Sequence, residues 1–278
     1  MVNFNNFTIK NLFISFGFIS KINLKLLITL ICLVFLSNSI NGNFHELANQ
    51  TIALKEILWL LSATIFTFLS IIINAYAWKY LIRNIGCNIN KLDVIKIFIN
   101  TNIYKYLPGG IWHFVSRYNM LRLNFTNERS VESVLLEPLL MLVAALIFIP
   151  FGSLNIFIFI LCWSSTLVLV KDFRGFIISV LKGMKTSIFT RNYKFDDTTY
   201  IQNNKNILPK KSYPFQPLLV EIIFILFRFF GFMCCINAFS VRSLISNSEL
   251  ISYFSFAWII GLIVPAAPGG MGVFESVI

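Results

Sequence analysis

The sequence predicts an all-α integral membrane protein, a polytopic helical bundle that forms one transmembrane domain over residues 1–278. Hydrophobic residues make up 57% of the chain, and charged residues only 13%. A soluble domain of this length could not cover so much apolar surface with polar side chains. The chain also contains repeated apolar runs near the roughly 20 residues that a helix needs to cross a bilayer. We therefore expect lipid to surround most of it.

Six apolar segments are candidate membrane-spanning helices. They cover residues 24–40, 57–82, 130–151, 153–170, 215–239 and 251–267. The first and last are the shortest. The basic residues Lys10 and Lys21 precede the first segment, but no A-x-A cleavage pattern follows it, which favours a retained anchor over a signal peptide.

The basic residues predict the orientation of the spans. Of the 23 Lys and Arg residues, only Lys55, Arg228 and Arg242 fall outside the N-terminal region, the segment 79–129 and the loop 171–214. Cytoplasmic loops carry an excess of Lys and Arg, so these three regions are expected on the cytoplasmic side, together with the N-terminus. The net charge of +11 is explained by this bias and by anionic headgroups. No RNA- or DNA-binding pattern accompanies it, so we expect no nucleic-acid partner.

The loop 171–214 has two parts. Apolar residues recur at helical spacing over residues 173–188, with basic residues on the other faces. This pattern predicts an amphipathic helix on the cytoplasmic leaflet. The remainder is polar and is expected to be a simple tether; a regulatory or lipid-sensing role is the alternative.

Two Pro-Gly-Gly breaks interrupt apolar sequence, in YKYLPGGIWHFVSR (104–117) and IVPAAPGGMGVFE (263–275). Residues 93–107 extend only about 22 Å as a helix, too short to cross a hydrocarbon core of about 30 Å. Gly109 and Gly110 let the chain reverse after Pro108, so we expect a re-entrant hairpin that returns as a second short helix over 111–123. A matching hairpin at the second break would make an inverted repeat.

Five ionisable residues lie in or beside the apolar segments, where charge is costly and commonly functional. They are Arg117, Glu137, Glu221, Arg228 and Glu275. The two arginines are candidates for binding a headgroup phosphate. The carboxylates at 137 and 275 could balance the arginines, engage a cationic headgroup or carry a proton. Glu221 is expected to reach the membrane interface, and pairing that merely stabilises the bundle is the structural alternative for the set.

Half-helix N-termini and free backbone N–H groups at the breaks favour an anion. His113, beside the first break, is a candidate proton relay. The chain contains no H-E-x-x-H or G-x-S-x-G pattern and only two histidines, so we expect neither an enzyme nor a metal or cofactor site.

The two break segments resemble the signature segments of the lysylphosphatidylglycerol synthase transmembrane-region family, also called the flippase-like domain family. By that resemblance the motif positions are Arg117, Gly269, Gly270, Gly272 and Glu275. The family implies a polytopic bundle in the inner membrane that is associated with moving modified phospholipid between leaflets. It also implies further helices, so the chain is expected to be truncated at Ile278. No aminoacyl-transferase domain is present in the sequence, and tRNA-dependent lysine transfer is not expected.

These features predict a flippase-like transporter of phospholipids or lipid-linked headgroups in a bacterial-type cytoplasmic membrane. Its substrate would be an anionic or lipid-linked membrane lipid. Two alternatives are a non-catalytic scaffold that serves a protein partner in envelope biosynthesis, and a lipid-modifying membrane enzyme. The sequence predicts no oligomeric state.

Overall fold

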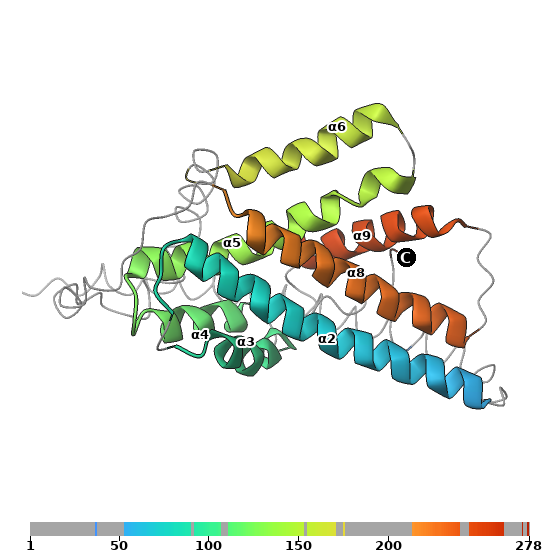
Figure 1. Cartoon of the computed structure of the whole chain (residues 1–278), viewed down its shortest axis with the longest axis horizontal. Coiled ribbons are helices and arrows are strands. Elements are labelled where there is room, and N and C mark those ends of the chain that lie inside the picture. Colours follow the sequence, from blue (N-terminus) through green and yellow to red (C-terminus); the bar gives the residue numbers. More distant parts are fainter. Residues whose placement is uncertain are drawn as a thin grey trace, which may run out of the picture.

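The computed structural model describes residues 53–89, 92–106, 111–152, 155–170, 213–239 and 245–263, and the single residues 37, 175, 274 and 277. Every element in these ranges is helical, as expected (Figure 1). The α-helices are α2 (Leu54–Asn84), α3 (Val94–Asn102), α4 (Trp112–Leu121), α5 (Asn127–Leu146), α6 (Ile156–Ser164), α8 (Phe215–Ala238) and α9 (Asn247–Ile263). Three 3₁₀ turns are η1 (Ile103–Tyr106), η2 (Ile149–Gly152) and η3 (Ser165–Leu169).

Three described helical segments are long and apolar enough to cross a membrane. They are α2, α5 continued through η2, and α8, which confirm three of the six predicted spans. The predicted spans at 153–170 and 251–267 form shorter apolar helices, Ile156–Leu169 and Asn247–Ile263. The predicted span at 24–40 and the predicted amphipathic helix at 173–188 lie outside the described residues.

Helices α2 and α8 pack together along much of their length (Figure 1). Their close approach depends on small side chains. A Cβ atom placed on Gly231 of α8 would lie 3.2 Å from Oγ1 of Thr67 and 3.4 Å from the carbonyl oxygen of Ala63 in α2. Small residues at helix contacts in membranes allow backbones to approach and gain van der Waals contact. Gly231 therefore sets the spacing of the central helix pair.

The ends of several helices meet on one side of the bundle. Asn84 at the end of α2 donates a hydrogen bond to the carbonyl of Tyr213 just before α8 (3.1 Å), and the Tyr213 hydroxyl donates to the Thr166 carbonyl in η3 (3.3 Å). Arg129, at the start of α5, donates to the carbonyl of Gly86. These bonds place the end of α2, the start of α5, the start of α8 and η3 on one side of the bundle.

Gly86 makes the turn that ends α2. Its φ of 89° lies in the left-handed region, which glycine adopts without steric cost. The next residue, Cys87, donates its N–H to the carbonyl of Ile82 (3.1 Å), which closes the helix end. This turn presents the Gly86 carbonyl to Arg129 and so joins the ends of α2 and α5.

The first break is flanked by two short helices, as predicted. Asp93 caps α3 by accepting a hydrogen bond from the Lys96 N–H (3.2 Å). Helix α4 begins at Trp112, after the break, and packs against α3 and η1. Both helices lie beside the C-terminal half of α2 (Figure 1). The turn itself, residues 107–110, lies outside the described residues.

The second break also lies outside the described residues, so the inverted repeat stays a prediction. Two residues after its Pro-Gly-Gly are described, Phe274 and Val277. The ring of Phe274 packs edge-on against Phe254 of α9 (centroids 5.4 Å apart) and Phe232 of α8 (6.3 Å). The chain beyond the second break therefore contacts the α8–α9 pair at this position.

Candidate functional site

The centre of the candidate site is an ion pair between the hairpin and α5. Arg117 of α4 is only 1% exposed, and its Nη1 donates to the Glu137 carboxylate. Glu137 is buried as well. The sequence analysis offered this balancing role as one of several for Glu137, and the structure shows the pair. A buried charge is tolerable only when it is paired and hydrogen-bonded, so each residue depends on the other.

The other contacts of the Arg117 side chain join the hairpin to α2. Its Nε donates to the buried hydroxyl of Thr101 in α3 (3.1 Å), and that hydroxyl lies 2.7 Å from the Ile97 carbonyl, to which it donates. The guanidinium also lies over the rings of Phe98 (3.9 Å) and Trp78 (5.2 Å). Aromatic faces attract cations, and more strongly where water is excluded. One arginine thus joins α2, α3, α4 and α5.

Glu137 immediately precedes Pro138 within α5. Proline has no N–H, so the carbonyl of Val134, four residues earlier, loses its helical donor. The helix nevertheless continues to Leu146. A carboxylate and a released carbonyl therefore lie close together in the interior, which adds acceptors to the region around Arg117.

Two further half-buried cations, Lys105 and Arg228, lie within electrostatic reach of each other. Lys105 belongs to η1, and its ammonium group interacts electrostatically with Arg228, Arg117 and Glu137. Arg228 of α8 lies against the rings of Phe224 (5.8 Å) and Trp258 (5.4 Å). Within the described ranges, neither cation has an ion pair. Like charges repel at this depth, so the pair favours an added anion.

Glu221 was expected to reach the membrane interface, and this expectation is wrong. Its side chain is 1% exposed and lies inside the bundle, within electrostatic reach of Glu137 and Arg117. Its Oε2 atom is buried and has no hydrogen-bond partner in the part of the chain that the structure describes. The sequence placed Glu221 near the start of a span, but α2 and α5 pack against α8, and its side chain is buried.

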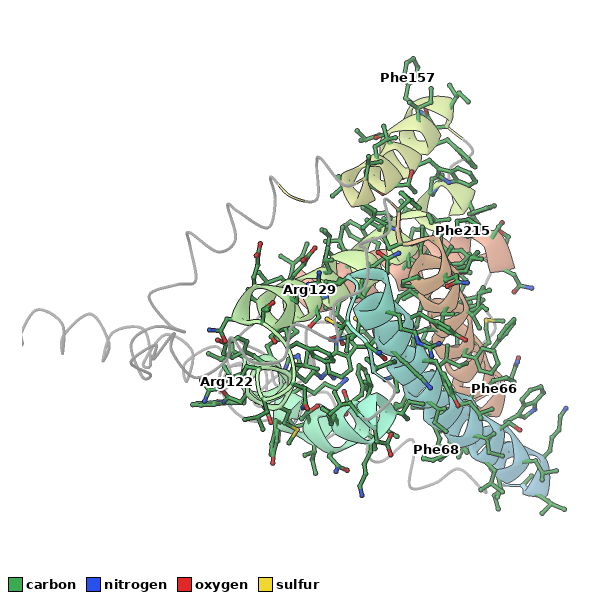
Figure 2. All side chains as sticks on the ribbon, turned by 60° about the vertical axis from the view of Figure 1, so that its left-hand side comes forward. Phe66, Phe68, Arg122, Arg129, Phe157 and Phe215 are labelled. Carbon is green, nitrogen blue, oxygen red and sulfur yellow. The ribbon has the colours of Figure 1, made fainter. Side chains whose placement is uncertain are left out.

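The structure collects five charged side chains from four elements: Lys105, Arg117, Glu137, Glu221 and Arg228. We call this set the charge cluster. Cations outnumber carboxylates in it, which suits an anion that also finds hydrogen-bond donors. Arg122 and Arg129 lie at the ends of α4 and α5 on one side of the bundle (Figure 2).

For the other predicted site residues, the structure does not test the predicted role. Gly109, Gly110, Gly269, Gly270, Gly272 and Glu275 lie outside the described residues. His113 is partly buried, with its ring beside that of Phe114 (3.8 Å), and its proton-relay role stays a prediction. Among the residues that the structure describes, no group of His, Cys, Asp and Glu is arranged to hold a metal ion.

The sequence analysis did not single out Lys105, Thr101 or Trp78 as members of a site. A signal for Lys105 was present, since it lies three residues before Pro108 in a helix too short to span. Thr101 and Lys105 are four residues apart and so lie near one face of that helical segment. Trp78 gave no such signal, because an aromatic residue in an apolar span is ordinary.

Comparison with known proteins places the chain in a family. No match was found among functionally curated proteins or among solved structures. The family model described as "Lysylphosphatidylglycerol synthase TM region" matches residues 22–278, which include the hairpin, α5, α8 and both Pro-Gly-Gly breaks. The chain is therefore an integral membrane protein that belongs to the lysylphosphatidylglycerol synthase TM region family.

Proposed function

We propose that the protein moves phospholipids or lipid-linked headgroups between membrane leaflets, and that the charge cluster binds the headgroup phosphate. The observation that carries this proposal is the pair of half-buried cations Lys105 and Arg228, which interact electrostatically and have no ion pair among the described residues. Ionisable residues at membrane depth face partners or a substrate path because their charges are otherwise costly. A phosphate between the two cations would supply the missing counter-charge.

The residues around the two cations suit an amphipathic ligand. Phe224 and Trp258 hold Arg228 from the α8–α9 side, and Tyr106 of η1 lies within its electrostatic reach. An arginine fork can bind a phosphate through two N–H groups, whereas a lysine adds a point charge. Large apolar side chains on the outer faces of the helices leave acyl tails free to stay in lipid.

The Arg117–Glu137 pair has a separate role in this proposal. It fixes the hairpin to α5, so the pair sets where Lys105 stands relative to Arg228. Movement of the hairpin against α8 would expose the two cations to one leaflet and then to the other. This is alternating access around a polar midplane site, as broken-helix transporters achieve it.

We also propose that the domain lies in a bacterial-type cytoplasmic membrane, with the N-terminus in the cytoplasm. The proposed function requires no catalytic chemistry, cofactor or nucleic acid, and it makes the protein a transporter and not an enzyme. The support for the orientation is the concentration of basic residues in the segments 79–129 and 171–214.

Leaflet redistribution of labelled lipids in proteoliposomes tests the function. We expect wild-type protein to move an anionic phospholipid faster than protein-free liposomes do. Lys105→Gln and Arg228→Gln each remove a charged hydrogen-bond donor, so each should slow redistribution by roughly tenfold or more.

Lys79→Gln is the matched control, because it removes one cation of α2 that lies outside the charge cluster. It should leave the rate close to wild type. A folded wild-type protein that moves lipid no faster than empty liposomes would sink the proposal, as would equal losses in the control and the cluster variants.

A further inference from the structure

Glu221 differs from the other carboxylate of the charge cluster. Glu137 has Arg117 as its ion-pair partner, whereas the Oε2 atom of Glu221 is buried without any hydrogen-bond donor. The charged groups in its electrostatic reach are Glu137 itself and Arg117, whose guanidinium is already engaged by Glu137 and Thr101. Among the described residues, Glu221 therefore has a negative neighbour and no cation of its own.

The other charges of the packed helices are not among those that act on Glu221. Arg228 follows Glu221 by seven residues, on the same face of α8 and about 10 Å further along the axis. The electrostatic neighbours of Arg228 are Lys105 and Tyr106. The remaining charged residues of α2, α5 and α9 likewise do not act on Glu221. They are Lys55, Glu56, Lys79, Arg83, Glu128, Arg129, Glu132 and Glu249.

We propose that Glu221 is a proton-binding site, and that an anionic headgroup and a proton pass through the domain together. Removing one partner of a buried ion pair is strongly destabilising because a buried charge is left uncompensated. A carboxylate at position 221 would be such a charge, and a bound proton removes it. The proton site stands on its own, whereas the coupling rests on the proposed lipid transport.

The coupling follows from the charges around the site. An anion held by Lys105 and Arg228 adds negative charge to a cluster that already contains Glu137, so it favours the protonated form of Glu221. Proton loss has the opposite effect, because an ionised Glu221 competes with Glu137 for Arg117. That competition weakens the contact that fixes the hairpin to α5. The anion and the proton therefore bind cooperatively, which is the condition for symport.

Infrared spectroscopy of the full-length protein in lipid vesicles tests the proton site without any transport assay. We expect the carbonyl stretch of a protonated carboxyl group at neutral pH, lost in Glu221→Gln and shifted in Glu221→Asp. Glu249→Gln is the control: Glu249 is partly exposed, and hydrogen bonds from Ser246 (2.8 Å) hold its pKa below the usual value. A wild-type spectrum without this band, or a band unchanged in Glu221→Gln, would overturn the proton site.

Redistribution of labelled anionic phospholipid across a gradient of one pH unit, at zero membrane potential, tests the coupling. Symport of one proton with one lipid should enrich the lipid about tenfold in the leaflet facing the alkaline side. Glu221→Gln should abolish this enrichment, and Glu249→Gln should keep it. Wild-type transport that ignores the gradient would overturn the coupling. A wild type that shows the infrared band but moves no lipid would remove the proposed function and leave the proton site standing.

Discussion

The two halves of α2 contrast in their surroundings although both are apolar. The first half exposes large side chains, among them Leu58, Leu61, Ile65 and Phe68. The second half is largely buried, including Asn74, Trp78 and Leu81, and it packs on the hairpin and the charge cluster. Figure 2 shows Phe68 projecting from the outer part of α2. Only the half that bears buried polar residues helps to build the site.

This contrast indicates what each half of the helix does. Exposed apolar side chains need no protein partner in lipid, because acyl chains are as apolar as they are. The buried half instead surrounds groups that lipid cannot satisfy, namely the Arg117–Glu137 pair and Glu221. Stability should therefore be concentrated in the buried half, and three predictions test this.

The largest effect is expected at the Arg117–Glu137 pair. Arg117→Ala leaves Glu137 buried without its counter-ion, and such breaks cost about 3–5 kcal/mol. Unfolding of the purified protein in mild detergent measures the loss. The double variant Arg117→Met/Glu137→Leu should recover most of it, because no buried charge is left. Arg83→Ala removes an exposed arginine at the end of α2 and is the control. An equal loss in Arg117→Ala and Arg83→Ala would contradict the role given to the pair.

The next effect compares the two halves of α2 directly. Trp78 is fully buried and lies against Phe98 (centroids 5.7 Å apart), whereas Phe68 is 63% exposed. Trp78→Ala should cost about 3–5 kcal/mol through lost packing and the cavity that remains. Phe68→Ala should stay within about 0.5 kcal/mol. The same detergent unfolding assay measures both variants. Similar losses from them would mean that the first half is also packed against protein.

A smaller effect is expected where α2 and α8 approach most closely. Gly231→Val places methyl groups against Thr67 and the carbonyl of Ala63, and overpacking of this kind typically costs about 1–3 kcal/mol. Gly175→Val is a control, because a Cβ at that glycine meets nothing within 4 Å. Thermal unfolding should separate the two variants. A Gly231→Val protein as stable as wild type would show that this contact can widen without loss.

Much of the fold could be predicted from the sequence because the length of each apolar run decides whether its helix can span a membrane. The apolar runs around α2, α5 and α8 are long enough to span a membrane, which made these three helices predictable. The segments before and after Pro108 are too short to span, which predicted two short helices there. The break at Pro-Gly-Gly also limited where α3 could end. The length of α9 was less certain, since the helix begins at Asn247 and its end lies beside the second break.

The charge cluster was only partly predictable. Each member stands out in the sequence as a charge within apolar surroundings, but helix periodicity relates residues of one helix only. The ion pair of Arg117 with Glu137 depends on how α4 packs against α5, and the electrostatic contact of Lys105 with Arg228 depends on the relative positions of η1 and α8. The error at Glu221 has the same origin: its distance from the helix end suggested exposure, while burial was decided by neighbouring helices.

The measurement that tests the central claim most directly is anionic lipid binding to the full-length protein by native mass spectrometry. The wild type should prefer phosphatidylglycerol over phosphatidylcholine, and Lys105→Gln/Arg228→Gln should lose most of that preference. Lys79→Gln/Arg83→Gln removes two cations outside the charge cluster and should retain it. Equal preference in the wild type and the cluster double variant would contradict an anion site at these two cations.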